Sequence, residues 1–366
     1  MKKVLILTNS SVGLYTFRNE LLEELLQKYQ VSVSIPDEVH LEELTEEGCL
    51  VIQTPINRRG MNPKEDFKLF CAYRKLLRET APDLVMLYTI KPNIYGGVAC
   101  RMGRVPYVAT ITGLGSTFQR ENFLKKMIVC MYRTALKKAE CIFFQNGENR
   151  QIFEQCRIRG KKSLLVNGSG VNLEKHAFEP YPQSPVTRFL YVGRMMREKG
   201  INEFLEAARK LHGETVRFEL LGYCDEDYTE ELDALEKEGI IRQHGFQTDV
   251  HSYLKEASAL VLPTYHEGMS NVLMEASATG RPVIATNISG CREIFEDGVT
   301  GFGCEPGSAE SLIEALQKFL ELSTEKRAEM GRNARRKMER EFDRQQVTDV
   351  YIKEIERHIA RKDGEK

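Results

Sequence analysis

Glu267 and Glu275 are the residues whose types and spacing say most about chemistry. They lie eight positions apart, about two turns at roughly 3.6 residues per turn, so on a helix they would share a face. Two carboxylates held there can accept hydrogen bonds from sugar and ribose hydroxyl groups. Between them, the backbone N–H groups of Met269, Ser270 and Asn271 would lack intrahelical partners if a helix begins here. Such groups suit a phosphate, so the segment predicts a sugar-nucleotide site.

The elements around this pair are a strand and a helix. The run Ala259–Leu262 is short, apolar and followed by Pro263, which is typical of a buried parallel strand. Gly268 would then open a helix that ends at Gly280, a natural stop. Glu267 is therefore expected at the rim of an anion site, where a strand turns into a helix.

Arg194 and Lys199 form a second group of chemical interest, in the segment Gly193–Gly200. Arg194 follows a predicted strand end at Gly193, so it should point toward the site at the ends of the strands. Guanidinium and ammonium groups bind phosphate oxygens and stabilise the charge that develops on a departing diphosphate. Ordinary surface charge is the alternative for both residues, as pairing with the helix dipole is for Glu275.

These segments resemble the retaining glycosyltransferases of family 4. In that family the first Glu of the pair contacts the donor sugar and the second binds the ribose, which here implies Glu267 and Glu275. The family's Arg and Lys hold the diphosphate, which implies Arg194 and Lys199. The segment Arg281–Ala285 resembles the strand that follows in this family, and the similarity covers nearly the whole chain.

The first half offers further candidate contacts. Gly13 ends the loop Thr8–Gly13 between a strand and a helix, where a glycine would let the backbone approach the donor diphosphate. No Gly-x-Gly-x-x-Gly dinucleotide fingerprint is present.

Two more strand ends carry candidate acceptor-side residues. Lys91 and Asn93 follow the strand Leu84–Tyr88, and they are either acceptor or phosphate contacts or parts of a structural turn. Many family 4 glycosyltransferases carry a His after this strand, acting on the donor sugar or the acceptor. This chain has Ile90 or Lys91 at the matching position. Thr112 and Gly113 begin a glycine turn, 112–116, which could also face the acceptor.

Strands alternate with helices throughout, which predicts an α/β protein with mainly parallel sheets. The resemblance implies a GT-B fold, in which two Rossmann-like, doubly wound domains face a central cleft. We predict an N-terminal acceptor-side domain over residues 1–173 and a proline-containing linker over 174–187. A donor-binding domain over 188–340 would follow, then a helix over 341–366 that returns to the N-terminal domain.

The other predicted strands are Val4–Thr8, Val31–Ile35, Leu50–Gln53, Tyr107–Thr112, Cys141–Gln145, Phe189–Val192, Phe218–Leu221, Ile240–His244 and Val283–Thr286. The predicted helices include Leu14–Lys28 and Pro63–Glu79.

Composition narrows the class of protein. The chain has 366 residues and a net charge of −1, with a basic first half and an acidic second half. This asymmetry either orients the protein on an anionic surface or has no function. The nine cysteines include no Cys-x-x-Cys pair, which indicates reduced thiols in a cytoplasmic protein. The sequence has no basic stripe interleaved with aromatic residues, so it gives no indication of nucleic-acid binding.

We expect neither a metal nor a resident cofactor. Asp225 and Asp227 have an Asp-x-Asp spacing, but they lie in an acidic loop. Arg194 and Lys199 could take the place of a metal at the diphosphate.

Residues 120–138 combine apolar residues with Lys125, Lys126, Arg133, Lys137 and Lys138. A basic amphipathic helix can lie at a membrane interface or attract anionic head groups. It can also be an ordinary packed helix with charged flanks. Members of the family with similar segments use lipid-diphosphate acceptors. We therefore expect this protein to be associated with the inner face of the cell membrane.

The function predicted from these features is transfer of a hexose or N-acetylhexosamine from a nucleoside diphosphate sugar, most plausibly a UDP-sugar. The expected acceptor is a lipid-diphosphate-linked saccharide in glycan or polysaccharide biosynthesis. The resemblance is strongest to bacterial transferases that extend undecaprenyl-diphosphate-linked sugars. Two alternatives stay open: a sugar-nucleotide epimerase, and a catalytically silent subunit that binds a sugar nucleotide.

Overall fold

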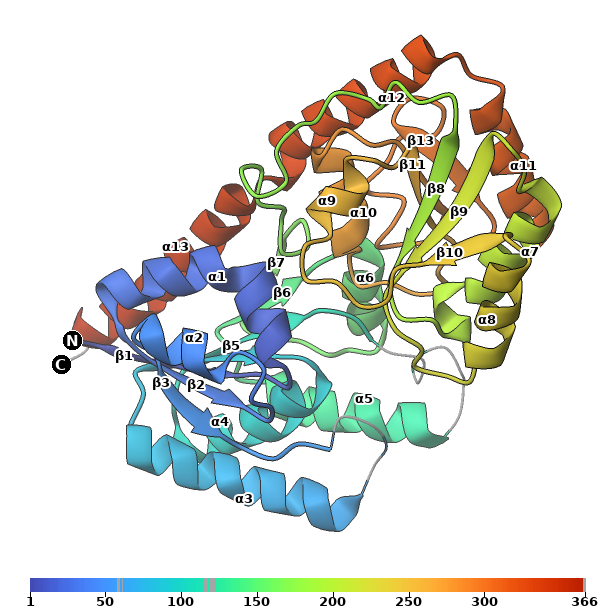
Figure 1. Ribbon diagram of the computed structural model, residues 1–366. Helices are drawn as coiled ribbons and strands as arrows, with labels where there is room; N and C mark the ends of the chain where they lie inside the picture. Colours follow the sequence, from blue (N-terminus) through green and yellow to red (C-terminus); the bar gives the residue numbers. More distant parts are fainter. Residues whose placement is uncertain (58–59, 61, 115–117, 119–122, 365–366) are drawn as a thin grey trace. The chain divides into compact units, whose positions relative to one another are not determined.

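The computed structural model describes residues 1–57, 60, 62–114, 118 and 123–364. The described chain divides into two units (Figure 1). Unit 1 comprises Met1–Ser169 and Arg344–Lys366, and unit 2 comprises Gly170–Asp343. Among the described residues, no helix is both long and apolar enough to cross a bilayer.

Unit 1 is built on a parallel sheet in the order β3-β2-β1-β4-β5-β6-β7. Its strands are β1 Lys3–Leu7, β2 Gln30–Ile35, β3 Leu50–Gln53, β4 Leu84–Tyr88, β5 Tyr107–Ile111, β6 Cys141–Phe144 and β7 Ser163–Leu165. Its helices are α1 Ser11–Lys28, α2 Leu41–Glu46, α3 Pro63–Thr80, the π-helix η1 Pro92–Gly96, α4 Gly97–Gly103, α5 Phe123–Leu136, α6 Gly147–Gln155 and α13 Arg344–Gly364.

Alternation along the strands of unit 1 supplies a core on each face of its sheet. In β1, Leu5 and Leu7 belong to the core shared with α3 and α5. Val4 and Ile6 point the other way, into the core shared with α1 and α13. These two helices lie side by side in Figure 1. Because successive strand side chains point to opposite faces, a parallel sheet needs helices on both sides.

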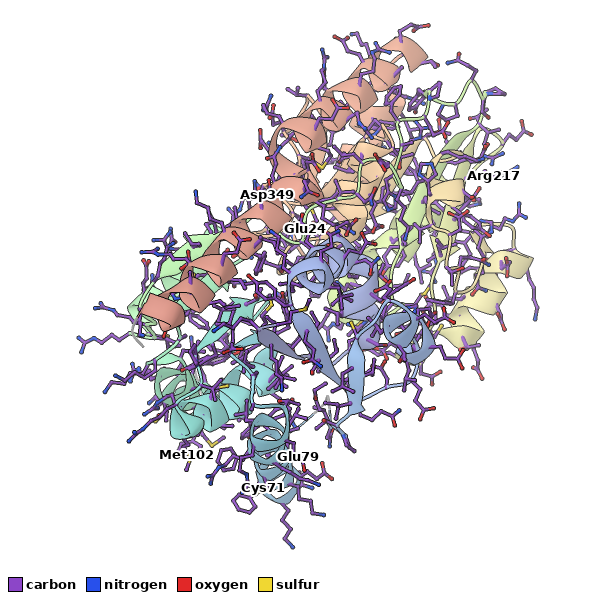
Figure 2. The ribbon with its side chains drawn as sticks, turned by 90° about the vertical axis from the view of Figure 1, so that its left-hand side faces the viewer. Glu24, Cys71, Glu79, Met102, Arg217 and Asp349 are labelled. Atoms are coloured by element: carbon purple, nitrogen blue, oxygen red, sulfur yellow. The ribbon has the colours of Figure 1, made fainter. Side chains whose placement is uncertain are left out.

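Helix α13 is fixed onto α1 by polar contacts as well as by apolar packing. Arg344 Nη1 lies 3.0 Å from Glu20 Oε2. Gln345 Nε2 donates to Glu24 Oε1 (2.6 Å) and to Asp349 Oδ1 (2.9 Å). Figure 2 shows Glu24 and Asp349 on this side of unit 1. The last helix is therefore an integral part of unit 1.

Unit 2 has a second parallel sheet in the order β10-β9-β8-β11-β12-β13. Its strands are β8 Thr187–Val192, β9 Val216–Leu221, β10 Ile241–Gln243, β11 Ala259–Leu262, β12 Val283–Thr286 and β13 Gly301–Cys304. Its helices are the 3-10 turn η3 Arg197–Lys199, α7 Ile201–Leu211, α8 Thr229–Lys237, α9 His251–Leu254, α10 Asn271–Ala278, α11 Ala309–Leu320, α12 Thr324–Lys337 and the π-helix η4 Met338–Phe342.

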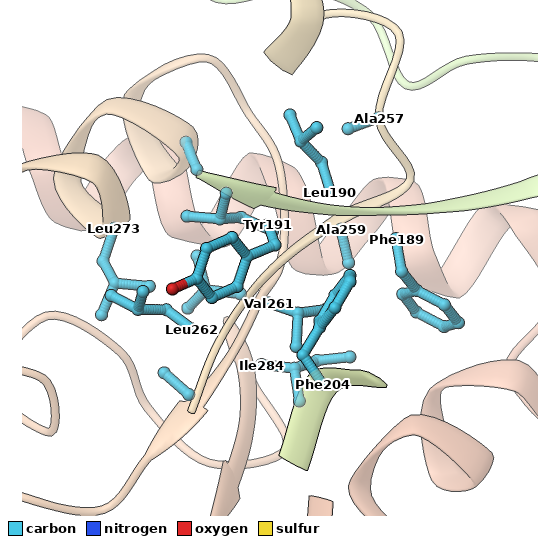
Figure 3. Close-up of a cluster of buried hydrophobic side chains, with 14 of the residues drawn as sticks. Phe189, Leu190, Tyr191, Phe204, Ala257, Ala259, Val261, Leu262, Leu273 and Ile284 are labelled. Atoms are coloured by element: carbon cyan, nitrogen blue, oxygen red, sulfur yellow. The ribbon is translucent and has the colours of Figure 1, made fainter. Parts of the chain in front are cut away.

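The core of unit 2 positions the polar loops at its strand ends. Figure 3 shows Tyr191 on β8 beside Leu262 and Leu273. Tyr191 is fully buried, and burial raises the pKa of its hydroxyl. That hydroxyl donates to Arg194 O at 2.9 Å. A buried hydroxyl needs a partner, and here the partner is the loop that carries Arg194.

Residues just before β8 are fastened to unit 2 by Arg281, whose side chain is fully buried. Arg281 donates to Glu179 O (3.1 Å) and Pro180 O (2.9 Å). It also donates to Leu254 O (3.0 Å). Burial lowers the pKa of Arg281 to about 10. Residues 179–180, which lie in the predicted linker, are thus packed within unit 2.

Candidate active site

The loop after β8 brings Lys199 to Glu267. Lys199 Nζ lies 2.5 Å from Glu267 Oε1, and the two side chains are 22% and 14% exposed. Lys199 ends η3, and Glu267 follows β11, the strand next to β8 in the sheet. Carboxyl ends of neighbouring parallel strands meet at one edge, which is where ligands bind in such sheets.

Arg194 lies on the same loop and pairs with Asp225. Arg194 Nη1 is 2.7 Å from Asp225 Oδ2. Asp225 belongs to the Asp-x-Asp spacing noted above, and its carboxylate here orients a guanidinium. Among the described residues, no group of three or more His, Cys, Asp or Glu side chains is placed to hold a metal ion.

Gly200 allows this loop to pass close to the end of β11. Its φ is 73°, and a Cβ at this position would lie 2.0 Å from Pro263 O. Only glycine accommodates both the left-handed backbone and this approach. The glycine therefore brings η3, and with it Lys199, against the strand that leads to Glu267.

The helix after Glu267 begins later than the sequence suggests. We expected Gly268 to open it, but α10 begins at Asn271 with Ser270 as its N-cap. Ser270 N–H donates to Gly290 O at 2.9 Å, so this predicted phosphate donor is already hydrogen-bonded. Gly193 directly follows β8, Gly268 lies in the loop between β11 and α10, and Met269 is buried in the core of unit 2.

The loop after β12 packs closely against the backbone of Glu267. Glu293 Oε2 accepts from Gly290 N–H at 2.7 Å, and Glu293 Oε1 accepts from the Ser289 hydroxyl at 2.9 Å. A Cβ at Gly290 would lie 2.8 Å from Glu267 O. The sequence analysis missed this support, although the residues Ser289–Glu293 follow a predicted strand end and could have been considered on that ground.

Glu275 lies on α10, in the same unit as Glu267. Its Oε1 is 3.9 Å from His176 Nε2, and its side chain is 12% exposed. Unit 2 therefore contains all four residues for which the family resemblance implies donor contacts: Arg194, Lys199, Glu267 and Glu275.

Gly13 is placed differently from the prediction. Helix α1 already begins at Ser11, so Gly13 lies in its first turn and not in a loop before it. Its N–H donates to Ser10 Oγ at 3.2 Å. Ser11 N–H, at the same helix end, lies 3.3 Å from both carboxylate oxygens of Asp37. The helix start is thus capped by this protein's own side chains.

A polar pocket of about 250 Å³ lies at the carboxyl ends of β1, β4 and β5 in unit 1. Lys91, Thr112 and Gly113 line it, as do Asn9, Ile56, Thr89 and Ile90. Lys91 Nζ is 2.7 Å from Asp66 Oδ1. Residues 115–117 of the predicted glycine turn lie outside the described residues.

Asn93 does not line this pocket. It is 1% exposed and its Nδ2 donates to Thr110 O at 2.9 Å. In this structure η1 turns the side chain of Asn93 into the core, where its amide is held by the backbone of β5.

Thr89 is a pocket residue that the sequence analysis missed. Its φ is 72°, an uncommon value for a threonine. Its buried hydroxyl has no hydrogen-bond partner among the described residues. Backbone strain at a residue with positive φ is found mostly at ligand sites. A single sequence gives no clear signal that a threonine will adopt a positive φ.

Comparisons with known proteins bear on both units. Residues 174–337 match the family model "Glycosyl transferases group 1", and residues 3–146 match "Glycosyl transferase 4-like". The chain belongs to the group 1 glycosyltransferases of family 4. The predicted family is thereby confirmed.

Curated relatives of this glycosyltransferase include two enzymes named for diphospho-undecaprenol substrates. The N,N'-diacetylbacillosaminyl-diphospho-undecaprenol alpha-1,3-N-acetylgalactosaminyltransferase of Campylobacter jejuni is 25% identical, over 96% of this chain and 98% of its own. The UDP-Gal:alpha-D-GlcNAc-diphosphoundecaprenol alpha-1,3-galactosyltransferase of Escherichia coli is 24% identical, over 79% of this chain and 80% of its own.

Solved structures support the fold. HepE of Anabaena, in a complex with UDP and glucose, superposes with a TM-score of 0.79 at 19% identity, over 97% of this chain and 99% of its own. With its two parallel α/β sheets, this glycosyltransferase has the predicted GT-B fold.

Proposed function

We propose that this glycosyltransferase moves a hexose or N-acetylhexosamine from a UDP-sugar, with retention of configuration, to a lipid-diphosphate-linked saccharide. The reaction would take place at the cytoplasmic face of the membrane, in glycan or polysaccharide biosynthesis. The observation that carries the transferase chemistry is the Lys199–Glu267 pair at the strand ends of unit 2. The acceptor class is supported by the names of the Campylobacter and Escherichia relatives.

Each side chain has a role that follows from its charge. Lys199 and Arg194 are cations that can bind the donor diphosphate and stabilise the charge it gains on leaving. Glu267, held by Lys199, can accept hydrogen bonds from sugar hydroxyl groups, and Glu275 from the ribose. No metal or resident cofactor is part of this proposal.

In the proposed reaction the bond between the anomeric carbon and the diphosphate oxygen breaks while the acceptor oxygen bonds to the same face of that carbon. The acceptor's hydroxyl proton passes to the departing diphosphate oxygen. Positioning and electrostatic stabilisation then supply most of the rate acceleration.

Membrane contact through residues 120–138 is part of the proposal. Helix α5 buries Ile128, Val129, Tyr132, Ala135 and Leu136. Lys126, Arg133, Lys137 and Lys138 remain exposed, where they can attract anionic lipid. Residues 120–122 of the predicted segment lie outside the described residues.

The test is to incubate the protein with a panel of UDP- and GDP-sugars, with and without a lipid-diphosphate saccharide. Nucleotide release and product mass are measured together. Acceptor-dependent release with one added sugar supports the proposal and identifies the donor. Release without an acceptor, together with an altered free sugar, would instead indicate an epimerase, and tight donor binding without turnover would favour the silent subunit.

A further inference from the structure

Unit 1 contains an apolar groove that the proposed chemistry does not use. The groove has a volume of about 460 Å³ and lies among α3, η1, α4 and α5. Its lining residues are Pro63, Asp66, Phe67, Phe70, Ile94, Tyr95, Val98, Cys130, Met131 and Thr134. Asp66 is the one charged residue among them.

The groove lies at the edge of the core of unit 1: Ile94 belongs to that core, and Phe70, Tyr95, Val98 and Met131 pack against it. On α3, the lining residues Pro63, Asp66, Phe67 and Phe70 follow helical spacing, while the core of unit 1 takes Leu69, Tyr73, Leu76 and Leu77. Phe67 is 66% exposed. A helix that presents apolar residues on a second face commonly marks an interaction surface.

The groove adjoins the polar pocket through one ion pair. Asp66 lines the groove and Lys91 lines the pocket. Their side chains lie 2.7 Å apart and are 7% and 14% exposed. One boundary therefore separates the pocket at the strand ends, whose lysine is paired with a carboxylate, from an apolar groove between helices.

We infer that the groove binds the isoprenoid chain of a lipid-diphosphate acceptor, with the diphosphate on the Lys91 side. The inference rests on the proposed function, because it specifies the lipid part of that acceptor. An isoprenyl diphosphate is a hydrocarbon chain with an anionic head: the chain matches the apolar groove, and the head can replace Asp66 as the partner of Lys91 at its boundary. Exposed Lys126, one helical turn before Cys130 on α5, adds positive charge near the same helix face.

A peptide segment fits this groove less well than a hydrocarbon. Buried peptide groups need hydrogen-bond partners, whereas the lining offers few polar side chains: Asp66 is paired with Lys91, and Thr134 and Tyr95 supply hydroxyl groups. A branched hydrocarbon chain makes no such demand and gains free energy from every apolar contact.

Two exposed cysteines provide a test that does not depend on catalysis. Cys130 lines the groove, whereas Cys71 is exposed on α3 outside its walls. Figure 2 shows Cys71 directed outward at one end of unit 1. Alkylation by a maleimide would be followed by mass spectrometry of the tryptic peptides 69–74 and 127–133, with farnesyl diphosphate or inorganic diphosphate present.

We expect farnesyl diphosphate to slow alkylation of Cys130 at least fivefold and to leave Cys71 unchanged. Inorganic diphosphate alone should protect neither residue, and Phe67→Asp should abolish the protection. Equal rates at Cys130 with and without farnesyl diphosphate would overturn the inference. Protection by plain phospholipid vesicles but not by farnesyl diphosphate would also overturn it, in favour of bilayer lipid as the occupant.

An activity measurement separates this inference from the proposed function. Acceptors with one saccharide diphosphate, on either a long or a short isoprenoid chain, would be compared. We expect KM to be roughly tenfold lower for the long chain, about 1.4 kcal/mol. That difference should vanish in Cys130→Asp and persist in Cys71→Asp, the matched control. Transfer to neither acceptor would count against the proposed function, whereas equal KM values for both would count against the groove.

Discussion

Lys199 Nζ and Glu267 Oε1 lie 2.5 Å apart, with both side chains mostly shielded from solvent. Lys199 is on the turn after β8 and Glu267 on the turn after β11, so this contact joins two neighbouring strand ends. Each residue holds the other in place, since a shielded charge is costly without a partner.

Lys199→Ala should lower kcat about 100- to 1,000-fold, the usual effect of removing one preorganised group that stabilises developing charge. Its Tm should also fall, because Glu267 keeps a shielded charge without its partner. The double variant Lys199→Ala/Glu267→Gln should recover much of the Tm but none of the activity. Lys210→Ala, at an exposed lysine of the same unit, is the control and should resemble the wild type.

Arg194→Ala should depress turnover and should also lower the Tm, because Asp225, whose side chain is 14% exposed, would lose the cation that faces it. Arg209 is the control for the loss of a half-exposed arginine: its side chain is 44% exposed and pairs with Glu231, which is 42% exposed, and the side chain of Arg194 is 42% exposed. Donor turnover and thermal unfolding would be measured for both alanine variants. Equal activity in the two would refute the role of Arg194 at the diphosphate.

Gly290→Ala should reduce both stability and turnover, because the new Cβ would lie 2.8 Å from Glu267 O. The control is Gly298→Ala. Both glycines have positive φ, 89° and 73°, but no atom lies within 4 Å of a Cβ built at Gly298. Backbone strain of about 1 kcal/mol is thus common to both variants, and the further loss in Gly290→Ala measures the displacement of Glu267. Equal losses in kcat would show that this crowding does not reach the site.

Glu354→Gln should lower the Tm of unit 1 near neutral pH and have a smaller effect in acid. Burial alone would raise the pKa of Glu354, but hydrogen bonds from Lys162 and His358, with their charges, outweigh it and lower the pKa. Lys162 Nζ and His358 Nε2 lie 2.5 and 2.9 Å from its carboxylate. A carboxyl whose folded-state pKa is depressed contributes stability above its ordinary value of 4.5 and loses it as the pH falls through the lowered value.

Thermal unfolding of the wild type and Glu354→Gln, measured from pH 7 down to about pH 3, checks this prediction. The Tm difference should be largest near neutrality and shrink below about pH 4.5. Glu356→Gln serves as the control, since Glu356 is 49% exposed in its pair with Lys28 and should matter little. A Tm difference that is constant across the pH range would contradict the linkage.

Strand boundaries were predicted best where residues that disfavour strands flank an apolar run. The runs Leu84–Tyr88, Ala259–Leu262 and Val283–Thr286 were predicted to the residue, because each is apolar and bounded by polar residues, proline or glycine. The three-residue strand β7 was not predicted, since Ser163–Leu165 is too short to show a period.

Side-chain partners were harder to predict than elements. The order of segments placed Lys199 and Glu267 at strand ends, but their contact depends on which strands are neighbours. The support of Glu267 by Gly290 and the pairing of Arg194 with Asp225 are likewise non-local. Asn93 was ambiguous, because a turn residue at a strand end can face either solvent or core, and the π-helix η1 decides the direction.

Unit 1 contains residues from both sides of unit 2, so unit 2 is an insertion within it. The apolar residues of α13, among them Tyr351 and Ile355, complete a core that β1 and α1 begin. During translation, unit 2 can therefore close its own core first, while the earlier-made part of unit 1 still lacks a helix. Unit 1 must wait, with apolar surface uncovered, until α13 leaves the ribosome, and we expect it to depend most on chaperones during this interval.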